Sequence, residues 1–105
     1  MTTAAERAQW EAWAREDAAR EGVPADGYVA LIERESAWDP TAVSDEGAGG
    51  LLQFMPATAD DYNIDPFSPA AAIAAGAAYL VDIRHYLDTN GVPVESWDTT
   101  LAGYN

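Results

Sequence analysis

Glu35 is the residue of this chain whose setting first suggests chemistry. At helical spacing it shares one face with the apolar side chains of Tyr28, Leu31 and Ile32. A carboxyl group at the end of such a face is directed toward a packed interior, where desolvation disfavours the charged form. A carboxylic acid that keeps its proton near neutral pH can act as a general acid. The alternative is that Glu35 is an ordinary helix-end residue with its side chain in solvent, because buried glutamate is rare.

The elements that must position Glu35 are helical. Thr3 and Glu6 form a capping-box pattern, and Pro56 suits the first turn of a helix. Strand-like alternation never exceeds three or four residues. The pattern predicts helices over about 4–21, 25–36, 56–62 and 70–87, and the beginning of another over 99–105. We expect loops over 41–50 and 63–69, and we expect Gly76 to permit close helix packing.

Length and composition allow one all-α domain over residues 1–105. Residues 1–22 are expected to form an N-terminal packing helix, and residues 25–105 carry the motifs described below. The net charge is −13, from 18 acidic and 5 basic residues, which disfavours nucleic acid as a partner because phosphate contacts need lysine and arginine. Cysteine is absent and there is one histidine, so we expect no metal site and no cofactor.

The sequence also bears on location. The first seven residues lack the apolar run of a signal peptide, and no segment approaches the roughly 18 apolar residues of a membrane span. We therefore expect synthesis as a soluble cytoplasmic chain without membrane insertion. His85 lies off the apolar stripe of the helix expected over 70–87, and we assign it no role.

Four patches in the sequence combine into a specific pattern. They are Glu35 and Ser36, the run Gly47 to Gln53, the run Met55 to Ala59, and Ala102 to Asn105. Together with Trp38, Pro40, Ala42, Ser44 and the segment 75–80, their order and spacing resemble the catalytic domain of soluble-type lytic transglycosylases, which are related to goose-type lysozyme. The resemblance covers roughly residues 25–105 and implies an all-α, lysozyme-like fold.

The resemblance implies an activity on peptidoglycan glycan strands. Glu35 corresponds to the single catalytic acid/base of the family. It would protonate the oxygen of the β-1,4 bond between N-acetylmuramic acid and N-acetylglucosamine, and would then act as base on the muramyl 6-hydroxyl. That reaction gives a 1,6-anhydromuramyl end without water and passes through an oxocarbenium-like transition state.

The other matched positions imply supporting roles at the site. Tyr104 would donate a hydrogen bond to Glu35, and Asn105 would support the site. Ser36 would hydrogen-bond near the end of the catalytic helix. Gln53, Phe54 and Met55 would line the cleft against the sugars, and Thr58 would steady that wall or cap a helix. A purely structural role is the alternative for each of these residues.

The end of the chain departs from the family pattern. The family domain continues past the motif that corresponds to Ala102 to Asn105 into further closing helices, and this sequence stops there. We expect either a second polypeptide or a second copy of the chain to complete the C-terminal side, or a domain that works as a minimal unit.

Two other functions remain open from the sequence. The first is a muramidase that hydrolyses the same bond with water, for which Asp45 or Glu46 could supply a second carboxylate. The second is a non-catalytic glycan-binding or structural piece. A small, cysteine-free domain of this kind is similar to a bacteriophage endolysin or virion-associated lysin, which would reach the wall through a holin or from the infecting particle.

Overall fold

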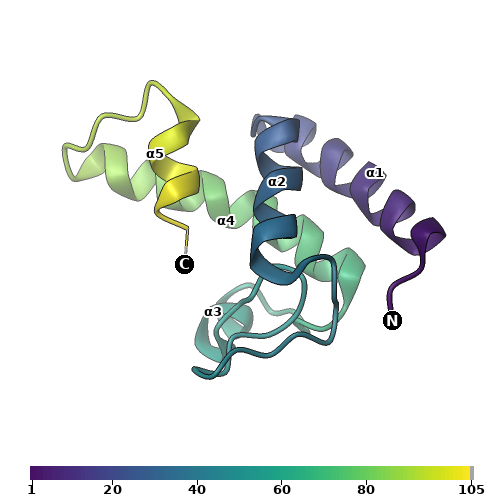
Figure 1. Cartoon of the computed structure of the whole chain (residues 1–105). Coiled ribbons are helices and arrows are strands. Elements are labelled where there is room, and N and C mark those ends of the chain that lie inside the picture. The colour runs from purple at the N-terminus through teal and green to yellow at the C-terminus, as the bar shows by residue number, and fades with distance from the viewer. Residues whose placement is uncertain (105) are drawn as a thin grey trace.

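The computed structural model describes residues 1–104, and these residues form five helices (Figure 1). The bounds are α1 Ala4–Glu21, α2 Ala25–Ser36, α3 Pro56–Asp61, α4 Pro69–Thr89 and α5 Trp97–Ala102. Among the described residues, extended pairing is limited to isolated bridges that join Gly49 to Val43 and to Phe54. The all-α prediction is confirmed, and the first two helices have the predicted bounds. The third and fourth differ from prediction by one or two residues, and the last begins two residues earlier.

The predicted capping signals set the ends of α1. The Thr3 side chain accepts from the Glu6 amide while the Glu6 carboxylate accepts from the Thr3 amide, so two otherwise unpaired donors are satisfied. Gly22 closes the helix with a left-handed φ of 79°. Figure 1 shows that α2 then turns back between α1 and α5, and that α1 packs against both α2 and α4.

The long helix α4 is the centre of the core. It packs along α1, and α2 reaches it through the Tyr28 side chain, whose hydroxyl donates to the Ile73 carbonyl over 2.5 Å. Gly76 faces the same contact, and a Cβ atom there would lie 2.7 Å from the Leu52 Cγ atom. The prediction that Gly76 permits close packing is therefore confirmed.

A compact loop over residues 37–55 follows α2. Ala37 and Trp38 both have left-handed backbone conformations, with φ of 49° and 62°, and the Trp38 side chain is fully buried. Gly50 also has a left-handed φ, and a Cβ atom there would overlap the backbone of Pro66. Gly50 thus lets two loop segments approach each other. This loop turns the chain sharply away from the last turn of α2 and leaves Glu35 facing it.

The segment between α4 and α5 is held by one arginine. The Arg84 Nε atom donates to the Val94 carbonyl over 3.1 Å, and its guanidinium lies 4.4 Å from the centroid of the Trp97 ring. Because α5 leads directly to Tyr104, this contact fixes the approach of the chain to the loop. None of the helices within residues 1–104 is long and apolar enough to cross a membrane.

Candidate active site

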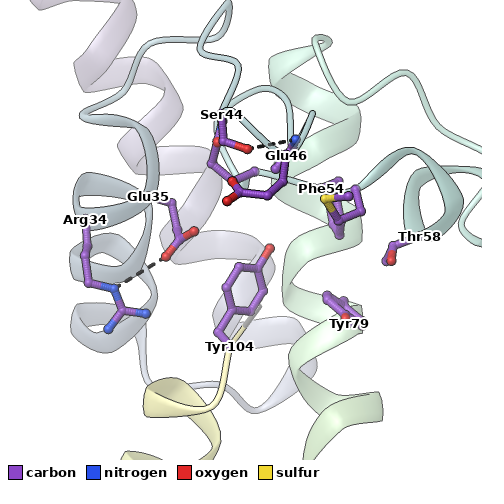
Figure 2. Close-up of a pocket in the computed structure, with 11 residues that line it drawn as sticks. Arg34, Glu35, Ser44, Glu46, Phe54, Thr58, Tyr79 and Tyr104 are labelled. Carbon is purple, nitrogen blue, oxygen red and sulfur yellow. Dashed lines mark hydrogen bonds and ion pairs between the residues drawn. The ribbon is translucent and has the colours of Figure 1, made fainter.

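A pocket of about 420 Å³ opens between the end of α2, the loop over 37–55, α3, α4 and the segment after α5. Figure 2 shows Glu35 and Thr58 on opposite sides of it, with the Tyr104 ring between them. The lining residues come from five separate stretches of the chain. They are Arg34, Glu35, Ser44, Glu46, Ala48, Gln53, Phe54, Met55, Thr58, Tyr79 and Tyr104.

Glu35 lies in the last turn of α2 with its side chain only 12% exposed. The three apolar residues predicted to share its face, Tyr28, Leu31 and Ile32, are buried. The helix ends one residue later, because Ala37 takes up a left-handed conformation and its amide donates to the Glu33 carbonyl. Glu35 is thus a largely shielded carboxyl group at the edge of the core, facing a pocket.

Tyr104 reaches the pocket from the other end of the chain, but it does not donate to Glu35. Its hydroxyl donates instead to the Leu52 carbonyl over 2.7 Å, and its side chain is buried. The predicted hydrogen bond between Tyr104 and Glu35 is therefore wrong, because the packing of Tyr104 against the loop gives its hydroxyl the Leu52 carbonyl as partner. Burial raises the pKa of Tyr104 well above its usual value, and the negative charge of Glu35 adds to the effect.

Gln53 lines the pocket, and its side chain also holds the loop together. Its backbone is left-handed, with φ of 51°, and its side-chain amide nitrogen donates to the carbonyls of Ala42 and Gly50 over 3.1 and 2.9 Å. These contacts join Ala42 to the turn from Gly50 to Gln53 within the loop over residues 37–55, which is called the glycine loop below. A non-glycine residue in this conformation is uncommon and is found where surrounding structure holds it.

Aromatic side chains make the wall opposite Glu35. The Tyr79 ring lies 5.7 Å from Phe54 and 5.7 Å from Tyr104, measured between ring centroids. Tyr62 extends the cluster, at 5.6 Å from Tyr79, and its hydroxyl donates to the Asp82 carboxylate. Phe54 is buried and Met55 is 41% exposed, so Met55 offers a ligand more open surface than Phe54 does.

Most of the residues predicted from the sequence meet at this pocket. Glu35, Gln53, Phe54, Met55, Thr58 and Tyr104 all line it. Ser36 is not among the lining residues; its hydroxyl donates to the Ile32 carbonyl in its own helix, over 3.2 Å. Asn105 lies outside the described residues. The supporting roles assigned to these side chains stay predictions.

Four lining residues were not assigned a site role from the sequence: Arg34, Ser44, Ala48 and Tyr79. Ser44 accepts a hydrogen bond from the Ala48 amide over 3.0 Å and so shapes the loop. Tyr79 is a large aromatic residue that lies off the apolar stripe of its helix. That position is the feature of the sequence that could have indicated a role at the site. Within residues 1–104 no group of three or more histidine, aspartate or glutamate side chains is placed to hold a metal ion.

Comparison with known proteins is consistent with this geometry. The profile of the transglycosylase SLT domain matches residues 12–105. The chain is 38% identical over 78 residues to a protein named membrane-bound lytic murein transglycosylase F from Desulfosudis oleivorans, covering 73% of this chain and 17% of that protein. It is 34% identical over 84 residues to membrane-bound lytic murein transglycosylase F 2 from Alkalilimnicola ehrlichii, covering 79% and 19%.

A third relative covers more of the chain. Membrane-bound lytic murein transglycosylase C from Histophilus somni is 32% identical over 104 residues, covering 87% of this chain and 29% of that protein. The chain thus spans less than a third of the length of these curated relatives. The match of the domain profile includes α2, the loop, α3, α4 and α5, which together build the pocket, and it identifies the helical fold as lysozyme-like. The chain belongs to the transglycosylase SLT domain family.

Proposed function

We propose that this domain cleaves the β-1,4 bond between N-acetylmuramic acid and N-acetylglucosamine in peptidoglycan and leaves a 1,6-anhydromuramyl end. The observation that carries the proposal is Glu35, a carboxyl group with 12% exposure that faces a pocket of about 420 Å³. The names of the relatives, lytic murein transglycosylases, support the reaction class.

One carboxyl group is sufficient for this reaction. The protonated Glu35 gives its proton to the glycosidic oxygen as the bond to the muramyl C1 atom breaks, and positive charge develops on the sugar ring. The resulting carboxylate then takes the proton of the muramyl 6-hydroxyl, whose oxygen bonds to C1. Because nucleophile and electrophile belong to the same sugar, ring closure avoids the entropic cost of bringing in a second molecule.

The walls of the pocket suit a sugar ligand. Phe54, Tyr79 and Tyr104 form a rigid aromatic floor, and the exposed Met55 can adapt its flexible side chain to the face of a ring. Thr58 and Ser44 supply hydroxyl groups at the rim. An apolar lining with a few polar groups is the usual composition of a small-ligand site.

A Glu35→Gln variant tests the assignment. We expect release of muropeptides from purified peptidoglycan to fall by at least about 100-fold, in keeping with the contribution of one general acid/base. The fold should be retained, which circular dichroism and urea unfolding can check. Glu16→Gln, an exposed change on α1 outside the pocket, is the matched control and should keep full activity. Unchanged release by Glu35→Gln would remove Glu35 as the catalytic group, whereas no release by the wild-type protein would favour the non-catalytic, glycan-binding alternative.

Hydrolysis by water is the second candidate function, and one observation favours it. Of the two acidic residues in the glycine loop that could act as a second carboxylate, Glu46 lines the pocket and Asp45 does not. Mass spectrometry of the products separates the two reactions, since anhydromuramyl ends identify the lyase and reducing ends the hydrolase. If hydrolysis occurs, Glu46→Gln should abolish the reducing ends and Asp45→Asn should not.

The biological setting stays a prediction. A bacteriophage endolysin or virion-associated lysin, released to the wall through a holin or carried by the particle, fits a cysteine-free peptidoglycan-cleaving domain. Expression in a bacterial host with and without a co-expressed holin tests the first route. Lysis that depends on the holin is the expected result for an endolysin.

A further inference from the structure

The five basic residues of this chain are all arginines, and four of them are engaged away from the pocket. On α1, each arginine has a carboxylate oxygen 2.7 Å away; the pairs are Arg7 with Glu33, Arg15 with Asp26 and Arg20 with Asp17. Arg84 donates to the Val94 carbonyl and covers the Trp97 ring. Arg34 is the remaining arginine, and it stands beside Glu35.

Arg34 is held loosely in comparison with the arginines of α1. Its Nε atom is 3.5 Å from a Glu35 carboxylate oxygen, and one terminal nitrogen donates to the Leu101 carbonyl over 3.3 Å. A guanidinium group has five N–H donors, so the second terminal nitrogen keeps its donors for a ligand. The side chain is 55% exposed and lines the pocket at the rim beyond Glu35, on the side away from Thr58 (Figure 2).

Arg34 is a positive group in an otherwise acidic pocket. Among the lining residues of the described chain it is the only cation, and the two other charged side chains there are Glu35 and Glu46. The chain as a whole carries a net charge of −13. An anionic ligand would be repelled by this surface unless a positive group met it, and Arg34 is the positive group at the pocket.

We propose that Arg34 binds a carboxylate carried by the muramyl residue of the substrate. The inference rests on the proposed function and deepens it, because a muramyl residue differs from other N-acetylated sugars in its lactyl substituent. That substituent either ends in a free carboxylate or continues into a stem peptide that carries carboxylates. A planar guanidinium matches a carboxylate through two parallel hydrogen bonds, a geometry that lysine does not reproduce.

The test compares wild-type protein and Arg34→Gln on four substrates. The first two are intact peptidoglycan and glycan strands stripped of peptides by an amidase, which leaves the lactyl carboxylate free. The other two are the same materials after carbodiimide coupling to an amine, which converts their carboxylates to neutral amides. The quantity measured is kcat/KM for release of soluble products. Arg20→Gln, which removes an arginine from α1, is the matched control and should behave as wild type.

We expect Arg34→Gln to lower kcat/KM about tenfold on a substrate with free carboxylates and to match wild type on the amidated form. A selective loss on intact peptidoglycan assigns the carboxylate to the stem peptide, and a selective loss on stripped strands assigns it to the lactyl group. Arg34→Lys should recover only part of the loss. An equal loss on free and amidated substrates would overturn the proposal, because Arg34 would then act through Glu35 or through the fold. No loss on any substrate would overturn it as well.

Failure of the proposed function gives a different result. If the domain does not cleave peptidoglycan, wild-type protein releases nothing from any of the four substrates. If only the Arg34 proposal fails, wild-type protein is active and its advantage over Arg34→Gln does not depend on the substrate carboxylates.

Discussion

The Tyr104 hydroxyl forms a buried hydrogen bond to the Leu52 carbonyl, and its ring lies in the pocket near Glu35. This arrangement positions the wall of the site, because it joins the end of the chain to the loop that carries Gln53. Tyr104 is therefore placed to influence Glu35, the proposed catalytic group, through packing and through the electrostatic interaction between the two side chains. At the residue scale, the site depends on a shielded carboxyl group and on a tyrosine kept neutral by burial.

Replacing Tyr104 with phenylalanine should destabilise the fold and change its response to alkali. The Leu52 carbonyl loses its partner, at a cost of about 1–2 kcal/mol in the free energy of unfolding near pH 7. Burial raises the pKa of Tyr104 in the folded state, whereas an unfolded tyrosine ionises near about 10. Its contribution to stability is thus complete below about pH 10 and is lost as the pH rises toward the folded value.

Urea unfolding between about pH 8 and 11 checks this prediction. The wild-type free energy of unfolding should fall more steeply above about pH 10 than that of Tyr104→Phe. Tyr28 and Tyr62, whose pKa values are also raised by burial, contribute equally to both proteins and cancel in the comparison. Parallel curves for the two proteins would contradict the burial of the Tyr104 hydroxyl in the folded state.

At the element scale, the site is assembled around α4, which meets the Tyr28 side chain of α2 and the Leu52 side chain of the loop over residues 37–55 at Gly76. Gly76 has no side chain to hold these elements apart, and the Tyr28 hydroxyl and the Leu52 side chain lie where a Cβ atom would be. Leu52 is also the residue whose carbonyl receives Tyr104. The contact at Gly76 thus connects the helix core to the wall of the pocket. The contact between Arg84 of α4 and Trp97 of α5 holds α5 against α4.

A Gly76→Ala substitution should therefore destabilise the protein although alanine is the better helix former. A Cβ atom at this position would lie 2.7 Å from Leu52 Cγ and 2.8 Å from Cδ1. Overpacking of this kind costs about 1–3 kcal/mol, which exceeds the gain of roughly 1 kcal/mol in helix propensity. Thermal or urea unfolding measures the difference.

Gly103→Ala is the matched control. Its Cβ atom would lie 3.3 Å from the Thr99 carbonyl oxygen, and no other atom comes within 3.4 Å. We expect its free energy of unfolding to stay within about 1 kcal/mol of wild type. A Gly76→Ala protein as stable as wild type would show that α2, α4 and the loop can separate without cost.

At the scale of the whole molecule, the charge sets how the domain meets its proposed substrate. The net charge is −13, and the bacterial wall is itself anionic, so the two repel at long range. Added salt screens this repulsion, with a Debye length of about 8 Å at 0.15 M ionic strength. Short-range contacts inside the pocket are screened less.

We therefore predict that activity on insoluble peptidoglycan rises as sodium chloride increases from about 10 to 150 mM, because screening speeds encounter. The initial rate of release of soluble products, measured at constant pH, checks the effect. Short, soluble glycan fragments carry less charge and serve as the control, with a weaker dependence on salt. A rate that only decreases with salt would contradict long-range repulsion as the limiting factor.

The local elements of this protein follow from the sequence by itself. Helix caps, proline positions and the 3.6-residue period placed the helices to within a few residues, because these signals act between near neighbours in the chain. The face that joins Tyr28 to Glu35 predicted a shielded carboxyl group, and the motif pattern predicted the family. Six of the eight predicted site residues line one pocket.

Long-range partners were decided only by the tertiary structure. The Tyr104 hydroxyl donates to the Leu52 carbonyl, and the Gln53 side-chain amide donates to the Ala42 carbonyl. Several acceptors are chemically suitable for each of these side chains. The sequence alone does not identify the one that folding brings to within about 3 Å. Arg34 and Tyr79 entered the site for the same reason. The types of side chain follow from the sequence, whereas their partners depend on how α2, the loop, α4 and the segment after α5 pack together.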